Sequence, residues 1–190
     1  MRKSILTLFA LAFLMSLSYQ ISAQGILKAP KQFSIDAGWS MLTNNTFGEN
    51  NIPGYNVSFD YAWKLSGFES DHGTYLSVPL GYSSFPKADS AENSIGVLIY
   101  GWTVRHELPF GEKLRPFLGY GLLLNQLRIS GTEGSIFGHQ TRFDLGANYK
   151  LNDRKKIYAA ISYSLVRFPR FGQKKSDRLN RFGIKIGYRF

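Results

Sequence analysis

The sequence of 190 residues contains no cysteine and few acidic residues, with 13 Asp and Glu against 23 Lys and Arg. The absence of cysteine excludes disulfides, a lipoprotein anchor and metal sites built on thiolates. Beyond its N-terminus the chain also lacks an apolar run of the roughly 20 residues that a membrane helix needs. A mature chain of this kind can cross a bilayer only as a closed barrel, because only helices and closed barrels satisfy every backbone polar group in lipid.

The formal net charge of +10 suggests an anionic partner. Nucleic acid is one candidate, but the sequence shows no recognition helix and no RNA-binding motif. We therefore expect an anionic layer of lipid headgroups to be the partner, and no nucleic acid.

The N-terminus predicts a secretory signal peptide over residues 1–23. Arg2 and Lys3 precede an apolar stretch over residues 5–17, and Ala23 supplies a small residue for cleavage before Gln24. We expect export to the periplasm, cleavage of this segment, and a single mature domain over residues 24–190.

The last ten residues alternate strictly between two kinds of side chain. Apolar and aromatic residues occupy one set of positions: Phe182, Ile184, Ile186, Tyr188 and Phe190. Polar or small residues occupy the other: Arg181, Gly183, Lys185, Gly187 and Arg189. This period of two predicts a β-strand with one apolar face. The same alternation predicts seven earlier strands over residues 32–42, 55–65, 74–83, 93–106, 114–127, 140–151 and 156–168.

The connections between these strands also alternate, and the longer polar ones cover residues 43–54, 84–92, 128–139 and 169–178. Most strands reach the roughly 9–11 residues that a tilted strand needs to cross a bilayer. The pattern predicts an all-β, eight-stranded, antiparallel, up-and-down transmembrane β-barrel, with its longer loops outside the cell.

In its alternation, loop pattern and terminal Phe190, the chain resembles the small eight-stranded outer-membrane barrels of the OmpA-barrel and OmpX type, the outer membrane protein beta-barrel domain group. The resemblance implies a monomer in the cell outer membrane. It also implies that Tyr188 and Phe190 belong to the signal that the barrel-assembly machinery reads during insertion. It implies no cofactor.

The alternative fold is a soluble barrel of the lipocalin kind, in which the apolar face of each strand points into the barrel and the polar face points to solvent. Aromatic residues near the strand ends favour the membrane barrel, because they form interfacial girdles. The polar face carries mid-strand charges, which suit a hydrated or ion-paired lumen: Asp36, Asp60, Asp144 and Lys185. Asp36, Asp60 and Lys185 lie on strands one, two and eight, which become neighbours when the barrel closes. We expect these three residues to form a buried ion-pair cluster across the closure.

The inward face of strands three to five is unexpectedly apolar, with residues such as Tyr75, Ile99 and Phe117. Ordinary packing explains it, since side chains fill an eight-stranded barrel. A slot for a hydrophobic small molecule, which OmpW-like barrels suggest by analogy, is the alternative. A bulge is expected near Pro79, which cannot donate to a ladder.

The enzyme hypothesis is a lipid A-modifying barrel, which places a His with a Ser and a carboxylate at its outer rim. Of the three histidines, only His139 falls at an outer loop, and no His-x-Ser pairing is present. We therefore expect no catalytic residues, and no motif predicts a metal site.

The last outer loop is strongly basic, with Arg170, Lys174, Lys175 and Arg178. These residues are candidates for contact with lipopolysaccharide phosphates, and a merely solvated loop is the alternative. The expected function is a structural or surface-interaction role in the bacterial envelope. A narrow pore, a hydrophobic-ligand barrel and an accessory role in a secretion system are the alternatives.

Overall fold

The computed structural model describes residues 30–46, 51–66, 73–86, 94–131, 133–152, 154–169 and 176–190. The predicted signal peptide lies outside these residues, and so do Arg170, Lys174 and Lys175. No helix in the described ranges is long and apolar enough to cross a membrane.

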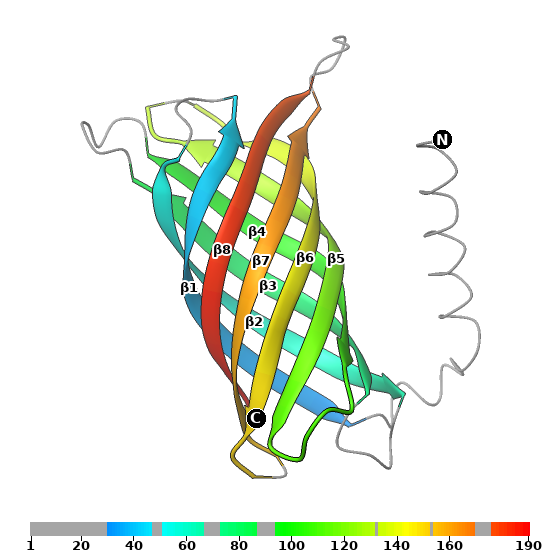
Figure 1. The fold of residues 1–190 in the computed structure, drawn as a ribbon. Helices are drawn as coiled ribbons and strands as arrows, with labels where there is room; N and C mark the ends of the chain where they lie inside the picture. The colour runs from blue at the N-terminus through cyan, green and yellow to red at the C-terminus, as the bar shows by residue number, and fades with distance from the viewer. Residues whose placement is uncertain are drawn as a thin grey trace, which may run out of the picture.

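Eight antiparallel strands form a closed barrel in which each strand pairs with the next and β8 pairs with β1 (Figure 1). The strands are β1 (Lys31–Asn45), β2 (Pro53–Ser66), β3 (Thr74–Phe85), β4 (Ile95–Glu107), β5 (Leu114–Ile129), β6 (Ile136–Lys150), β7 (Lys156–Phe168) and β8 (Asp177–Arg189). This architecture confirms the predicted fold class. We call the end where β1 begins and β8 finishes the terminal end, and the opposite end the loop end.

Several strands run further toward the loop end than the sequence predicted. β6 begins at Ile136 and not at residue 140, because Ile136 already pairs with Leu127 of β5. β8 begins at Asp177 and not at residue 181, so Arg178 belongs to a strand and not to the last loop. Polar residues and a glycine among these positions, such as Gly138, His139 and Asp177, suggested loops, although the backbone continues the ladders.

The two faces of each strand are oriented as a membrane barrel requires. Outward residues such as Leu122 (68% exposed) and Ile186 (63%) form an apolar outer surface. Inward polar residues such as Asp36 (3%) and Asn148 (0%) are buried. The opposite, lipocalin-like orientation of the faces is therefore excluded.

The barrel closes through the pairing of β1 with β8, which we call the closure seam. Ile35 pairs with Tyr188, and Ala37 pairs with Ile186. Beyond β8, the backbones of Phe33 and Phe190 exchange two hydrogen bonds of 2.9 Å. The chain thus ends on a residue that is bonded to the first strand.

The wall between β3 and β4 is interrupted at Pro79. Ladder pairs occur on both sides of it, Ser77 with Thr103 and Leu80 with Tyr100, in the same register. The proline therefore produces a gap in the ladder without the register shift of the expected bulge. Gly101 lies opposite this gap with a φ of 148°, a value that glycine adopts without steric cost.

Candidate functional site

The lumen is packed in layers, and the layer nearest the loop end is apolar. Its side chains come from six strands and form one buried cluster: Leu42, Phe85, Ile95, Val97, Ile99, Leu123, Leu127, Val166, Phe168 and Leu179. Among the apolar inward residues of strands three to five, those near the loop end, such as Ile95 and Ile99, thus join residues from β1, β7 and β8, whereas Tyr75 and Phe117 lie outside this cluster. They close one end of the lumen and do not line one side of it.

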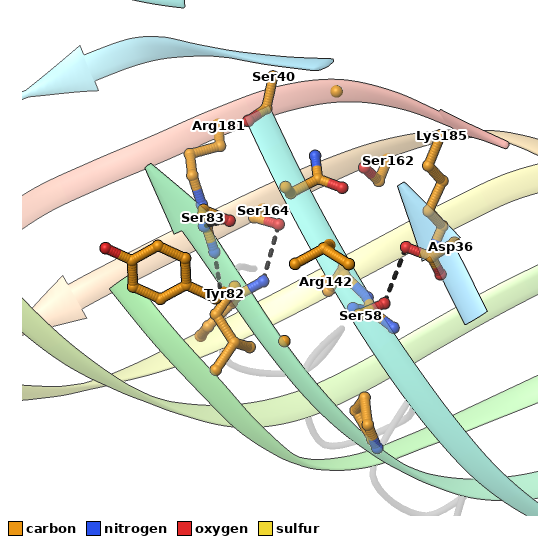
Figure 2. A pocket seen from close by; sticks show the side chains of 17 residues that line it. Asp36, Ser40, Ser58, Tyr82, Ser83, Arg142, Ser162, Ser164, Arg181 and Lys185 are labelled. Carbon is orange, nitrogen blue, oxygen red and sulfur yellow. Dashed lines mark hydrogen bonds and ion pairs between the residues drawn. The ribbon is translucent and has the colours of Figure 1, made fainter. Parts of the chain in front are cut away.

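Below this cluster, Arg181 of β8 reaches across the lumen (Figure 2). Its Nη1 donates to Ser83 Oγ on β3 at 3.0 Å, and its Nη2 donates to Gln140 Oε1 on β6 at 2.7 Å. Gln140 in turn donates to Ser164 Oγ on β7 at 2.8 Å. The Arg181 side chain therefore links β8 to β3 and β6 across the lumen.

The next layer contains three of the four predicted lumen charges. Lys185 Nζ lies 3.8 Å from Asp36 Oδ2 and 3.6 Å from Asp144 Oδ2, so it joins β8 to β1 and β6. Asp36 also accepts hydrogen bonds from Ser58 Oγ at 2.8 Å and from the Tyr158 hydroxyl at 2.5 Å. These contacts span the closure seam.

Asp60, the fourth predicted residue, lies at a different level. It pairs with Ser34 on β1, and Ser34 pairs with Arg189 on β8, four residues beyond Lys185. Its Oδ1 is buried and accepts no hydrogen bond from the described residues. Asp144 occupies the place beside Lys185 that the sequence suggested for Asp60, and Arg142 Nε lies 3.1 Å from Asp144.

A second charged network, near the terminal end, was not recognised in the sequence. Glu107 is fully buried, with Lys156 Nζ at 2.8 Å and Arg105 Nη2 at 3.5 Å, and it accepts a hydrogen bond from Asn148 at 2.9 Å. Arg189 donates to Asn148. The sequence placed Glu107 in a turn, although its position two residues after Arg105 on the same strand face was a usable signal.

Aromatic rings complete this network. The Arg189 guanidinium lies 3.7 Å from the centroid of the Tyr158 ring and 4.8 Å from that of Phe117. Arg105 lies 4.5 Å from the centroid of Tyr75. Such cation–π contacts stabilise buried cations, so the apolar inward residues Tyr75 and Phe117 serve as partners of charged groups.

Little space remains between these side chains. A cavity of about 50 Å³ lies in the polar layers, where Asp36, Ser58, Arg142, Arg181 and Lys185 are among the residues that line it (Figure 2). A second cavity, of about 20 Å³, lies beside Asp60 and Arg189. A buried water needs a cavity of roughly 10–15 Å³, whereas pockets for drug-sized ligands span about 300–1,000 Å³. These cavities suit a few waters.

The described histidines are not joined to catalytic partners. His106 Nδ1 lies 3.0 Å from Thr74 Oγ1, and Glu107 next to it faces the lumen. His139 is exposed on β6, and the nearby Ser135 Oγ accepts a hydrogen bond from Gln126. His72 lies outside the described residues. Within those residues, no three His, Asp or Glu side chains are grouped to hold a metal ion.

The other predicted residues that the structure describes, Tyr188, Phe190 and Arg178, lie on the outer surface. Phe190 is 53% exposed and stacks on Phe33 with ring centroids 6.0 Å apart, and Tyr188 lies 5.9 Å from Phe190. Arg178 is exposed near the loop end of β8. It is the only one of the four lipopolysaccharide candidates that falls among the described residues.

The model of the family described as "Outer membrane protein beta-barrel domain" matches residues 9–190. The chain belongs to this family. Membership implies an outer-membrane location and agrees with the closed eight-stranded barrel and its apolar outer surface.

Solved structures support the family fold. Neisserial surface protein A (NspA) superposes with a TM-score of 0.66 at 13% identity, over 84% of this chain and 95% of that one. The outer membrane enzyme PagL superposes with a TM-score of 0.52 at 14% identity, over 84% of this chain and 98% of that one. At such low identity the likeness shows the fold alone, and one of the two similar proteins is an enzyme.

Proposed function

We propose that the protein is a non-enzymatic, non-conducting barrel of the outer membrane with a structural or surface-interaction role. One observation carries this proposal: contacting side chains cross the lumen from the apolar cluster to Glu107 and leave cavities of only about 50 and 20 Å³. A filled barrel holds its loop end rigidly at the membrane surface, which suits envelope integrity or adhesion.

The pore alternative is disfavoured by the contacts that cross the lumen. Arg181 joins β8 to β3 and β6, and the apolar cluster above it includes Leu127 and Phe168, both fully buried. An ion would have to break these hydrogen bonds and displace packed side chains. The small cavities disfavour a hydrophobic-ligand barrel as well.

The enzyme alternative lacks converging groups among the described residues. A nucleophile, a base and an orienting group must lie within hydrogen-bond reach. In the described ranges His139 has no such partners, and the side-chain contacts of His106 there are with Thr74 and the Tyr120 ring. We also propose that the loop end faces the cell exterior, that the barrel is monomeric, and that Tyr188 and Phe190 serve the assembly machinery.

Planar-bilayer recording of the purified barrel tests the filled lumen. We expect no stepwise conductance from the wild type, and we expect it from a variant with Leu127→Ala, Phe168→Ala and Arg181→Ala. Regular unitary steps from the wild type would contradict the proposal.

A second experiment tests the surface role. Residues 87–93 and 170–175 are replaced by Gly-Ser segments, and the variant is expressed in a deletion strain. We expect the variant to insert into the outer membrane normally but to fail to restore adhesion or detergent resistance.

A further inference from the structure

Three basic residues form a row on the outer surface at the loop end. His139 on β6 pairs with Arg167 on β7, and Arg167 pairs with Arg178 on β8. Directly opposed residues on one face of an antiparallel sheet have Cβ atoms about 4.5–5.5 Å apart. The two arginines are therefore immediate neighbours, and the histidine adjoins them.

The burial pattern shows that the row faces outward. Arg167 lies between Val166 and Phe168, which are both fully buried in the lumen. Arg178 is exposed between two buried residues, and so is His139. The side chains of the row therefore point away from the lumen, toward the surroundings of the barrel.

No acidic group compensates these charges within the described part of the chain. Neither arginine forms an ion pair with a described residue. Arg167 is half-buried, and its Nη1 is buried without a hydrogen-bond partner among the described residues. Asp177 is buried and accepts a hydrogen bond from Thr46. Like charges directly opposite each other on a sheet are destabilising, so the arrangement calls for an anion from outside the chain.

The row lies at the depth of lipid headgroups. Four residues closer to the terminal end, Phe143, Tyr163 and Phe182 form an aromatic row on the same three strands. Four residues at about 3.3 Å each, along strands tilted by about 40°, span roughly 10 Å of the membrane normal. Aromatic girdles mark the membrane interface, so the basic row lies on the loop side of this aromatic row, with exposed Phe137 two residues further along β6.

We infer that Arg167, Arg178 and His139 bind the phosphate of a lipid A headgroup in the outer leaflet, with acyl chains lying against the aromatic row below. The inference rests on the proposed orientation of the loop end. A phosphate monoester offers three acceptor oxygens, which two adjacent guanidinium groups bind by charge-assisted, bidentate hydrogen bonds. The phosphodiester of a phospholipid carries less charge and offers fewer such oxygens.

Binding to the purified full-length barrel tests this site, with bisphosphorylated lipid A, dephosphorylated lipid A, phosphatidylglycerol and inorganic phosphate as probes. Native mass spectrometry in detergent reports the lipid retained. We expect the double variant R167Q/R178Q to bind bisphosphorylated lipid A about thirtyfold more weakly than the wild type, since each basic residue near an anionic lipid contributes about fivefold in affinity. We expect the wild type to prefer it over dephosphorylated lipid A by a similar factor.

Two matched controls separate this site from general charge. R128Q removes an exposed arginine at the same end on β5, and R154Q/K155Q removes two exposed cations at the terminal end. Both are expected to retain wild-type binding. Equal binding by R167Q/R178Q and the wild type would overturn the inference, and so would equal loss in R154Q/K155Q. Equal affinity for phosphatidylglycerol or inorganic phosphate would overturn the assignment to lipid A.

If the variant R167Q/R178Q does not fold, a measurement on the wild-type barrel still tests the site. Bisphosphorylated lipid A should raise the temperature at which the barrel unfolds in a heat-modifiability gel, and the dephosphorylated form should not. An equal shift with both lipids would contradict the phosphate site. The conductance experiment is independent of these results, so a failure of this inference can be told from a failure of the proposed function.

Discussion

Lys156 Nζ lies 2.8 Å from Glu107 Oε2, and both side chains are buried in the lumen on strands that are not neighbours. Glu107 also lies near Arg105 and accepts a hydrogen bond from Asn148. One carboxylate therefore compensates several cations at the terminal end.

Glu107→Gln should strongly destabilise the barrel. It leaves buried cations without their carboxylate, and breaking a buried pair in this way typically costs about 3–5 kcal/mol. Urea unfolding in detergent micelles, monitored by tryptophan fluorescence, measures the free energy of unfolding. Glu112→Gln, in an exposed turn, is the control and should change it little. A loss of stability below about 1 kcal/mol for Glu107→Gln would show that the network contributes little.

The closure seam should depend on Asp36 more than on Asp60. Asp36 bonds Ser58, Tyr158 and Lys185, whereas Asp60 Oδ1 has no described hydrogen-bond partner. Asp36→Ala should lower the unfolding temperature in a heat-modifiability gel, with a cost of about 3–5 kcal/mol. Asp60→Ala should lower it less. The reverse order would show that the contacts of Asp36 do not stabilise the seam.

Replacing an outward-facing apolar residue by arginine should lower the stability of the barrel, and the loss should be larger the closer the residue lies to the middle of the membrane. Ile186 is exposed on the outer face midway between the outward-facing rings of Phe182 and Phe190, so Ile186→Arg should cost up to about 2–4 kcal/mol. Ile136→Arg, at the loop end of β6, should cost about 1 kcal/mol or less. Outer-membrane yield and urea unfolding in lipid vesicles measure both variants. Full-yield assembly of Ile186→Arg with unchanged stability would contradict the membrane position.

The terminal aromatic residue should matter for assembly. Phe190→Ala removes the ring that stacks on Phe33 and packs near Tyr188, but it retains the backbone hydrogen bonds to β1. We expect Phe190→Ala to lower the outer-membrane yield in cells markedly, whereas the stability of the purified, folded protein should fall only slightly. Phe110→Ala, an exposed aromatic residue in a turn, is the control. Equal yields from the two variants would argue against an assembly signal at Phe190.

Alternation along single strands predicted the fold and the direction of each face, because period two is a local property of the backbone. It could not predict the partners of the lumen charges. Those partners depend on the level at which each residue lies, and the stagger between strands sets that level. Asp60 and Asp144 are both inward aspartates, yet only Asp144 lies beside Lys185.

The basic row was missed for a related reason. Arg167 was assigned to a strand and Arg178 to a loop, so their direct pairing was not visible. Strand ends are hard to place where polar residues continue a ladder, since side-chain polarity marks solvent contact and not the end of backbone pairing.

The closure seam has a consequence for the order of folding. Every other pairing joins consecutive strands, so those hairpins close short loops, whereas β1 and β8 are separated by nearly the whole chain. Such a contact carries the largest loop-closure entropy and forms slowly. Because β8 also carries Arg181, Lys185 and Arg189, the interior hydrogen bonds of the barrel remain incomplete until this strand docks. The pairing of β8 with β1 and the formation of the lumen hydrogen bonds should therefore occur in one cooperative step.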